Sequence, residues 1–367
     1  MPAGNYLLSH SVGCLPVVTK PNPADEFFQS WQSLGGNAWP TWLTYIDTFC
    51  QALATLFNAK AEQFCPQSNV SSALTKIIYS LPHTPHKNTI LLSENDFPSL
   101  GFVLSLAQQR GWQLRFLAKD TPIYDLETWR KQLTPDVKLV FITHVNSVQS
   151  QRAPVKALIA LAKQHDIISI VDIAQSAGVI PIDLTQWAAD FVVGSCVKWL
   201  CGGPGAGFLW VNPAILMQCR PLDVGWFSHD DPFEFDIHHF KYATDAKRFW
   251  GGTPSVLPYL IAASSITLIH QIKVAKIYDH NQALLDILHQ GAMEHGIEAL
   301  SPRSKKHRGG TLTLKLNHPT QTVSLFNQHQ ILFDVRQQNG FRFSPHIYNT
   351  TEEIQALGQL FKVIGKK

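Results

Sequence analysis

The feature that most constrains the fold is the alternation of short apolar segments with helical patterns between residues 46 and 258. The apolar segments are rich in β-branched residues, and their hydrophobic residues are largely continuous rather than alternating with polar ones, which is typical of strands in a parallel sheet covered on both faces. Five such strands are expected, at residues 89–92, 137–143, 167–171, 191–194 and 207–211. Helical patterns occur at residues 46–60, 99–110 and 154–165. The alternation predicts an α/β domain with three α/β/α layers and a mostly parallel sheet.

The pattern changes after residue 258. A long helical stretch, residues 259–295, could connect two domains or bend at its middle. Strand candidates at 311–316 and 331–336 and a closing helix at 351–364 then predict a small α+β domain. We therefore expect an N-terminal segment (residues 1–45) that packs with the small domain, a large domain (46–258), and an interdomain helix with the small domain (259–367).

Composition excludes several classes of protein. Charged residues make up 16% and hydrophobic residues 45% of the chain, which argues against disorder. The formal net charge is only +3, too small to indicate a nucleic-acid-binding surface. The six cysteines form no C-x-x-C pair, which argues against a zinc knuckle or a disulfide framework. Without a signal-peptide pattern or an apolar stretch of about 20 residues, the chain is expected to be cytoplasmic and free of membranes.

Residues 170–211 carry the candidate chemical groups. Asp172 ends one expected strand, Gln175 follows it, and the next strand delivers Ser195 and Lys198 before a glycine-rich turn. Ligands of open α/β sheets bind at the carboxyl ends of strands, and a desolvated lysine there can act as a nucleophile or form a Schiff base. The same residues would equally suit a helix cap and a surface lysine. Spacing alone leaves both interpretations open.

The chain resembles the class V aminotransferase superfamily, which binds pyridoxal phosphate, has fold type I, and includes cysteine desulfurases and kynureninases. The run VDIAQSAG, the following IDLTQWAADFVVGS, and the lysine before GGPGAGFL resemble its cofactor site. Other counterparts occur in family order along nearly the whole chain: YLLSHSVGCLP near the N-terminus, DFPS, GWF, GGTPS and FRFSPHIYNTTEEI. The resemblance implies a fold-type-I enzyme that uses pyridoxal 5'-phosphate.

The resemblance assigns a role to each matching residue. Lys198 would form the Schiff base, Asp172 would keep the pyridine nitrogen protonated, and Gln175 would donate to the phenolic oxygen of the cofactor. Phe97 in DFPS matches the aromatic residue that stacks on the ring in kynureninases, where desulfurases usually have histidine. For a single phenylalanine, a place in the core is the simpler alternative.

The phosphate group is expected near a helix that starts after residue 67. Ser68 and Asn69 precede that helix where the family has two threonines, and Ser195 would be a third donor. A helix cap would use the same residue types. Trp226 in GWF resembles the kynureninase tryptophan near the phosphate. Thr253 in GGTPS resembles a residue that the second subunit contributes, so the resemblance implies a homodimer with shared sites.

Arg342 matches the arginine that binds the substrate α-carboxylate, with Arg336 as the alternative. A desulfurase needs a cysteine shortly before this arginine, and the chain has none after Cys219. The chain also departs from kynureninases: Gln175, Val197 and Leu100 stand where those enzymes have histidine, tyrosine and aspartate. We expect kynureninase-like cleavage of an amino acid, with an aminotransferase as the alternative and a non-catalytic ligand-binding protein as the alternative of another class.

Sixteen histidines raise the question of a metal site. No pair has the H-E-x-x-H spacing, and pairs such as His238 and His239 lack a matching carboxylate pattern, so no metal is expected. His144 is of more interest because it follows the expected strand at 137–143, at the proposed cofactor edge.

Overall fold

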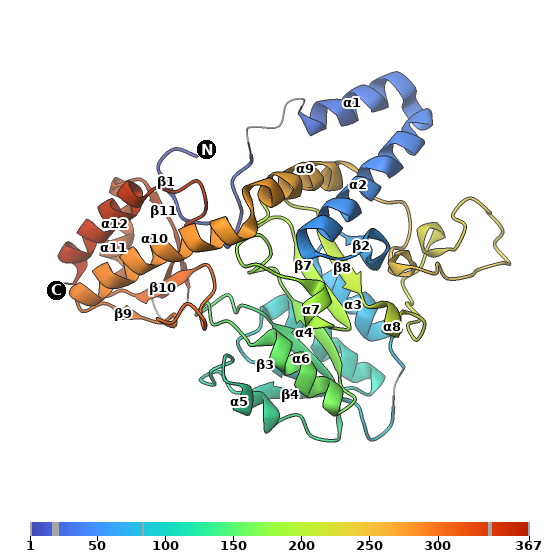
Figure 1. Ribbon diagram of the computed structural model, residues 1–367, viewed down its shortest axis with the longest axis horizontal. Coiled ribbons are helices and arrows are strands. Elements are labelled where there is room, and N and C mark those ends of the chain that lie inside the picture. The colour runs from blue at the N-terminus through green and yellow to red at the C-terminus, as the bar shows by residue number, and fades with distance from the viewer. Residues whose placement is uncertain (1, 17–21, 83, 337–339, 366–367) are drawn as a thin grey trace.

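The computed structural model describes residues 2–16, 22–82, 84–336 and 340–365. Two hydrophobic cores organise these residues. The larger core surrounds the central sheet, and the smaller one lies toward the C-terminus (Figure 1). The long helix α10 (Val274–Glu294) extends from the larger part into the smaller one.

The central sheet has seven strands in the order β2-β8-β7-β6-β5-β3-β4. Its strands are β2 (Phe64–Gln67), β3 (Thr89–Ser93), β4 (Gln113–Leu117), β5 (Val137–Thr143), β6 (Ile168–Asp172), β7 (Phe191–Ser195) and β8 (Gly207–Val211). Neighbours are parallel from β7 to β4, whereas β8 is antiparallel to both β7 and β2. The expected α/β fold with a mostly parallel sheet is confirmed.

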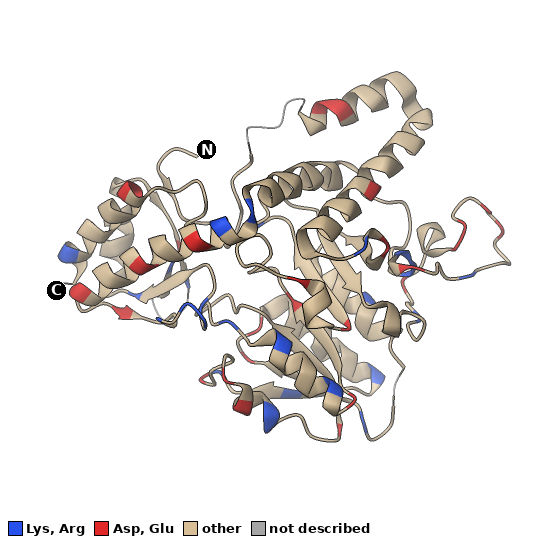
Figure 2. Cartoon of the chain, in the orientation of Figure 1, with Lys and Arg blue, Asp and Glu red and all other residues tan. Residues whose placement is uncertain are grey.

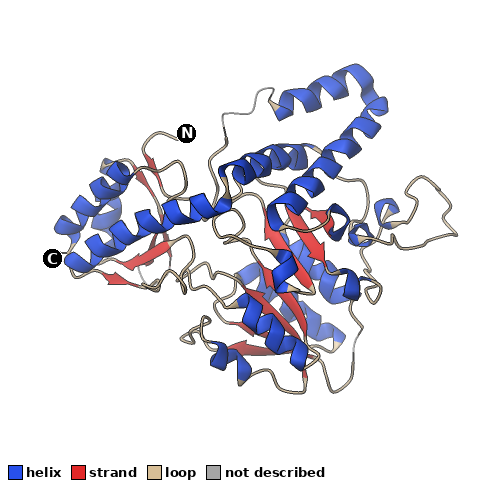
Figure 3. Ribbon diagram, in the orientation of Figure 1, coloured by secondary structure: helices blue, strands red, loops and turns tan. Residues whose placement is uncertain are grey.

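Helices cover both faces of this sheet. The helices of this part are α2 (Trp39–Phe57), α3 (Val70–Ser80), α4 (Pro98–Ala107), α5 (Leu126–Arg130), α6 (Val155–Gln164), α7 (Leu184–Trp187), α8 (Pro213–Leu216) and α9 (Leu257–Ile272). In the view of Figures 1 and 3, α6 and α7 lie in front of the sheet, and α3 and α4 lie behind it. Helix α6 is amphipathic, as its sequence pattern predicts: Leu158, Ile159 and Ala162 are buried on one face, and Lys156 and Lys163 are exposed.

The smaller part is an antiparallel sheet in the order β12-β13-β10-β9 with helices packed on it. Its elements are β9 (Glu298–Ala299), β10 (Leu312–Lys315), α11 (Pro319–Gln328), β12 (Asp334–Arg336), β13 (Gly340–Phe343) and α12 (Thr351–Ile364), together with α10. Helix α12 begins with a capping box between Thr350 and Glu353, which satisfies N–H groups at its first turn.

The long helical stretch is two helices, α9 and α10, that meet at 77°. The break is at Lys273, which has φ of 76° and donates its N–H to the carbonyls of Ile269 and His270. No proline or glycine marks the break in the sequence, which is why the sequence pattern continues through it. Among the described residues, no single helix is long and apolar enough to cross a membrane; α9 and α10 pass that test only as a bent pair, by length and composition.

The N-terminal segment has contacts in both parts. Strand β1 (Asn5–Tyr6) pairs in parallel with β11 (Ile331–Leu332), and Leu7 is buried in the smaller core. In contrast, helix α1 (Pro23–Leu34) contacts α9 of the larger part. Helix α2 begins at Trp39, earlier than expected, because the Trp39-Pro40 pair supplies the helix start that prolines favour.

Candidate active site

Lys198 lies in the turn after β7, at the edge where the parallel strands end. Its carbonyl accepts a hydrogen bond from the Cys201 N–H at 2.9 Å. The N-terminal segment passes close to this turn, because the Gly13 N–H donates to the Val197 carbonyl at 2.8 Å. A Cβ atom at Gly13 would lie 2.1 Å from the Lys198 oxygen, so only glycine permits this contact.

Asp172 is the last residue of β6 and pairs in register with Val193 of β7. Its side chain is 7% exposed, and Oδ1 accepts a hydrogen bond from the Ala174 N–H at 2.8 Å. Burial raises the pKa of Asp172, opposed by that hydrogen bond and by the charge of Lys198. Burial also lowers the pKa of Lys198, opposed by Asp172. A cation bound at the carboxylate and a covalent bond at the amine would relieve both costs.

Phe97 is the aromatic neighbour of Lys198. It is the N-cap residue of α4, and its ring centroid lies 5.7 Å from Lys198 Nζ. The side chain is 44% exposed, which is unusual for a phenylalanine with a core role. A flat ring attached to Lys198 would therefore lie within stacking reach of Phe97.

Asp96 precedes Phe97 and holds the turn from which that ring projects. Its Oδ2 accepts a hydrogen bond from the Ser93 N–H at 2.9 Å, and its Oδ1 accepts one from Thr143 Oγ1 at 2.6 Å. Burial raises the pKa of Asp96 to about 7, and the charge of nearby Asp172 acts in the same direction. The carboxyl group therefore titrates near neutral pH.

Replacing Asp96 should change how stability depends on pH. Because its pKa is raised in the folded state, ionisation of Asp96 destabilises the fold as pH rises from about 4 to about 7. Asp96→Asn cannot ionise, so the difference between its Tm and the wild-type Tm (variant minus wild type) should be more positive at pH 8 than at pH 5. Thermal unfolding of the cofactor-free proteins at both values measures this, and an equal Tm difference at the two pH values would contradict it.

Gln175 connects the cofactor edge with the N-terminal segment. Its Nε2 donates to the His10 carbonyl at 3.1 Å, and its Oε1 accepts from Trp199 Nε1 at 3.2 Å. These two contacts fix the amide orientation and leave one N–H of Nε2 for another acceptor.

Arg342 is buried, at 2% exposed, and is held by a carboxylate of its own chain. Asp334 lies opposite it across β12 and β13 and accepts from Nε at 2.7 Å and from Nη2. Nη1 donates to the Ser147 carbonyl at 2.6 Å. Arg336 is 52% exposed with Nε 3.5 Å from Asp334, and the charges of both arginines lower the pKa of Lys198. The two arginines that are candidates for binding a substrate carboxylate thus lie close enough to Lys198 to affect its pKa.

Comparisons with known proteins show the family of the chain. The Aminotransferase class-V family profile matches residues 43–357. The chain belongs to this family. An uncharacterized aminotransferase, YcbU, of Bacillus subtilis is 25% identical over 87% of this chain and 84% of its own length. The kynureninase of Pseudomonas fluorescens is 25% identical over 97% of this chain and 88% of its own. The solved structure of the cystine C-S lyase C-DES with its product cysteine persulfide is 21% identical, covers 99% of this chain and 98% of its own, and superimposes with a TM-score of 0.89.

As a class-V member, the protein is a pyridoxal-phosphate-dependent enzyme. The described residues fit that cofactor. A lysine with a lowered pKa, a buried carboxylate for the ring nitrogen and an open aromatic ring lie at one edge of the sheet. Together these groups supply what the cofactor requires for covalent attachment, ring protonation and stacking.

The expected phosphate donors lie at the start of α3. Asn69 caps this helix, because its Oδ1 accepts from the Ser72 N–H at 2.9 Å. Ser68 Oγ, which is exposed, donates to Ser72 Oγ at 3.3 Å. Ser195 ends β7 and pairs in register with Gly207, which in turn pairs with Gln67 just before Ser68. Ser68 and Asn69 therefore follow the end of β2, and Ser195 ends β7, on the two sides of β8 and at the same edge of the sheet. Their role at the phosphate stays a prediction.

Trp226 and Thr253 lie in the segment between β8 and α9. The ring of Trp226 packs against Phe227, Phe233 and Phe235. Thr253 is exposed, shortly after the short helix Ala246–Phe249. Within the single chain, Trp226 belongs to an aromatic cluster and Thr253 is exposed, and the roles expected for both at the cofactor stay predictions.

His144 is buried behind this edge. Its Nδ1 lies 2.9 Å from Ser176 Oγ, and its Nε2 accepts from Arg152 Nε at 3.3 Å. Both ring nitrogens are therefore engaged. Burial lowers its pKa well below the usual range, so the ring is neutral. These contacts indicate a structural role for His144.

Within the described ranges, one group of ligand types could hold a metal ion: His229, Glu234 and His239, whose ligand atoms lie within 4.8 Å of one another. The hydrogen bonds of His229 oppose this role. Its Nδ1 accepts from the Asp231 N–H at 2.9 Å, so its proton is on Nε2, which lies 2.6 Å from the His239 carbonyl. A metal ion at Nε2 would displace that proton, and the neutral ring would then carry its proton on Nδ1. That N–H would face the Asp231 N–H, so two donors would oppose each other. The three residues are better described as a set of hydrogen bonds that holds the loop of residues 229–239 together.

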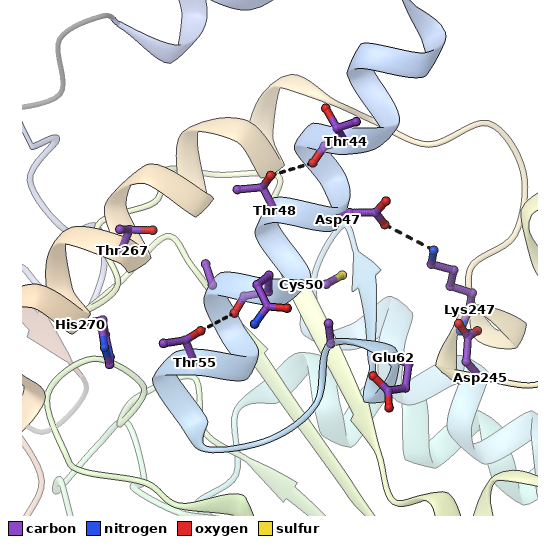
Figure 4. Close-up of a pocket in the computed structure, with 13 residues that line it drawn as sticks. Thr44, Asp47, Thr48, Cys50, Thr55, Glu62, Asp245, Lys247, Thr267 and His270 are labelled. Atoms are coloured by element: carbon purple, nitrogen blue, oxygen red, sulfur yellow. Dashed lines mark hydrogen bonds and ion pairs between the residues drawn. The ribbon is translucent and has the colours of Figure 1, made fainter.

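A cavity of about 720 Å³ lies beside α2 and α9, as Figure 4 shows. It is lined mainly by polar side chains, including Thr48, Glu62 and Asp245, and the ion pair of Lys247 with Asp47 (3.4 Å) lies in its wall. None of the residues assigned above to the active site belongs to this lining. The site at Lys198 is a separate feature of the sheet edge.

Sequence reasoning missed three residues at the site: Asp96, Asp334 and His10. Asp96 is the first residue of the DFPS motif, so its position beside Phe97 could have marked it as a site residue. Asp334 could have been found as an opposite charge near Arg342, once the two strands were paired. His10 lies inside the run YLLSHSVGCLP, but its contacts could not be inferred from it, because its partners are more than 160 residues away.

Proposed function

We propose that the protein cleaves the side chain of an amino acid in a kynureninase-like reaction, hydrolytic or lyase. The observation that carries this proposal is the exposed ring of Phe97 beside Lys198, since kynureninases place an aromatic residue there. The sequence from Asp334 to Phe343 contains no cysteine, so a thiol nucleophile of the desulfurase kind is absent from it. The similarity to kynureninases over nearly the whole chain supports the same choice.

Each site residue has a part in this proposal. When bound, pyridoxal phosphate supplies an electron sink for negative charge at the substrate Cα. Asp172 would hold the proton on the ring nitrogen. Lys198 would hold the cofactor covalently, and its amine would serve as the base for the Cα proton of the substrate; its lowered pKa favours the neutral amine that a base must have. Gln175 has one N–H left for the phenolic oxygen.

Arg342 is the proposed ligand of the substrate carboxylate. A guanidinium has five N–H donors, of which Asp334 takes two and the Ser147 carbonyl one. Two donors remain, enough for a bidentate contact. Arg336 adds a second, more exposed positive charge on the same side.

An aminotransferase is the second candidate. The similarity to YcbU favours it, as does Val197, which stands where kynureninases have a tyrosine hydroxyl. Holoenzyme incubated separately with L-kynurenine, L-cysteine, and L-alanine plus a keto acid distinguishes the candidates. Conversion of the cofactor to its amine form by L-alanine, without side-chain cleavage of any substrate, would favour the aminotransferase over our proposal.

We also propose a homodimer with shared active sites. Exposed apolar side chains occur on α1 and on the loop after Trp226: Phe28, Trp31, Leu34, Phe233, Phe235 and Ile237. The arm from Pro23 to Phe57 contains no lysine or arginine, and Figure 2 accordingly shows it tan and red with no blue. Such apolar surface is typical of an interface between proteins.

Sedimentation should give a particle of twice 41.1 kDa at micromolar concentration with cofactor bound. The pair of changes Phe235→Asp and Ile237→Asp should shift it toward the monomer, because each places a charge in the proposed interface. Val363→Asp, at an exposed apolar position on α12, is the matched control and should leave the dimer intact. A wild-type monomer under these conditions would contradict the proposal.

A further inference from the structure

His10 lies where the N-terminal segment meets both parts of the molecule. It is 2% exposed, and its carbonyl accepts the hydrogen bond from Gln175 of the larger part. Its side chain faces the smaller part, with Nε2 3.2 Å from Asp334 Oδ1 and Nδ1 2.6 Å from Ser344 Oγ. One residue thus contacts a neighbour of the cofactor and the carboxylate that holds Arg342.

The hydrogen bonds determine which nitrogen of His10 carries the proton. Burial lowers its pKa to about 4, so the ring is neutral and has a single N–H. An ionised carboxylate only accepts, so the proton is on Nε2 and Nδ1 accepts from Ser344. Ser344 Oγ in turn lies 2.8 Å from Thr311 Oγ1, which donates to it. The chain of contacts fixes the ring and aims Nε2–H at Asp334.

Asp334 then receives donors from two directions. Arg342 approaches its carboxylate through Nε and Nη2, and His10 approaches Oδ1 from the N-terminal segment. A carboxylate held by one guanidinium can still rotate with it, whereas a second, rigid donor fixes the plane of the pair. The direction of the two unused N–H groups of Arg342 therefore depends on His10 as well as on Asp334 and the Ser147 carbonyl.

We infer that His10 is a positioning residue for the substrate carboxylate, acting through Asp334 on the free donors of Arg342. The inference rests on the proposed role of Arg342 as the carboxylate ligand. It explains why a neutral histidine is buried beside a carboxylate and an arginine in a segment far from both in sequence. It predicts that loss of the Nε2–H contact weakens binding of an amino acid carboxylate more than binding of the corresponding carboxamide.

Two substitutions separate the contacts of the ring. His10→Asn keeps an acceptor near Ser344 but removes the donor to Asp334, and His10→Gln keeps a donor near the position of Nε2. The probes are L-alanine and L-kynurenine, each compared with its carboxamide. Their dissociation constants come from the change in the visible absorbance of the holoenzyme. The ratio of amide to amino-acid dissociation constants measures carboxylate recognition.

Wild type should favour the amino acids by at least about tenfold, as expected for a charged hydrogen-bonded contact. His10→Asn should reduce the ratio about tenfold, and His10→Gln should stay within about threefold of wild type. Ser9→Ala is the matched control, because Ser9 lies in the same buried segment but contacts Tyr348 instead. It should leave the ratio unchanged even if Tm falls. If His10→Asn does not fold, Ser344→Ala, which frees the ring, should lower the ratio.

Three outcomes would contradict the account, the first two at the role of His10 and the third at the proposed function. If wild type prefers the amino acids and the His10 and Ser344 variants keep that preference, the positioning role of His10 is wrong while the proposed function stands. If the ratio falls in Ser9→Ala as much as in the His10 variants, and in each case in proportion to the loss of Tm, His10 has only a structural role. If the wild-type holoenzyme responds to no amino acid in this assay, the proposed function itself fails.

Discussion

Lys198→Ala should yield a protein without the visible absorbance of a lysine-bound cofactor, and turnover should fall by about 10⁴-fold or more. The amine of Lys198 has two roles in our account, since it binds the cofactor covalently and carries the Cα proton. Its place after β7, beside Phe97 and under the electrostatic influence of Asp172, suits both. Absorbance spectra with added pyridoxal phosphate, before and after borohydride, measure the first role, and single-turnover rates measure the second.

The controls for this substitution are direct. Lys156→Ala changes an exposed lysine on α6 and should leave spectrum and turnover unchanged. In wild type, borohydride should bleach the visible band by reducing the bond to Lys198. A Lys198→Ala protein that keeps the band and loses it to borohydride would mean that another lysine holds the cofactor.

Asp172→Asn should reduce turnover by about 10²- to 10³-fold, in the range found when a preorganised electrostatic contact is lost. The carboxylate is buried with one backbone donor, and a protonated ring nitrogen is the partner that would keep it ionised. Asparagine preserves the shape but cannot hold that proton, so charge at Cα would be less stabilised. Steady-state rates with the best substrate and the spectrum of the bound cofactor test this prediction.

Asp166→Asn, at an exposed position before β6, is the matched control and should act like wild type. The Asp172→Asn variant should still bind the cofactor through Lys198, because the covalent bond is intact. Unchanged turnover in Asp172→Asn would show that this carboxylate does not contact the ring nitrogen.

The central strands could be predicted from sequence, because strands buried on both faces carry mostly continuous apolar residues rather than an alternating pattern. This rule found β3, β5, β6, β7 and β8. It missed β2, which contains Pro66 and is only four residues long, and β4, whose side chains are largely exposed at the edge of the sheet. A bend in the stretch 259–295 was one of the expected alternatives, but its position at Lys273 gave no signal, because it depends on how α9 and α10 pack on different cores.

The residues of the site also divide into those that could be placed from sequence and those that could not. Asp172 and Lys198 could be placed from sequence because each follows a strand, and parallel strands end at one edge. The ion pair of Arg342 with Asp334 and the contact of His10 depend on strand pairing and on the path of the N-terminus, which local patterns do not contain. The expected strand at 331–336 is divided into β11 and β12, and this division places Asp334 opposite Arg342.

The most direct test of the account is incubation of the wild-type holoenzyme with L-kynurenine, followed by measurement of anthranilate by its fluorescence. A kynureninase-like enzyme should release anthranilate and alanine in equal amounts, and Lys198→Ala should release neither. The absence of anthranilate from a holoenzyme that transfers the amino group of L-alanine to a keto acid would contradict kynureninase-like cleavage and identify an aminotransferase instead.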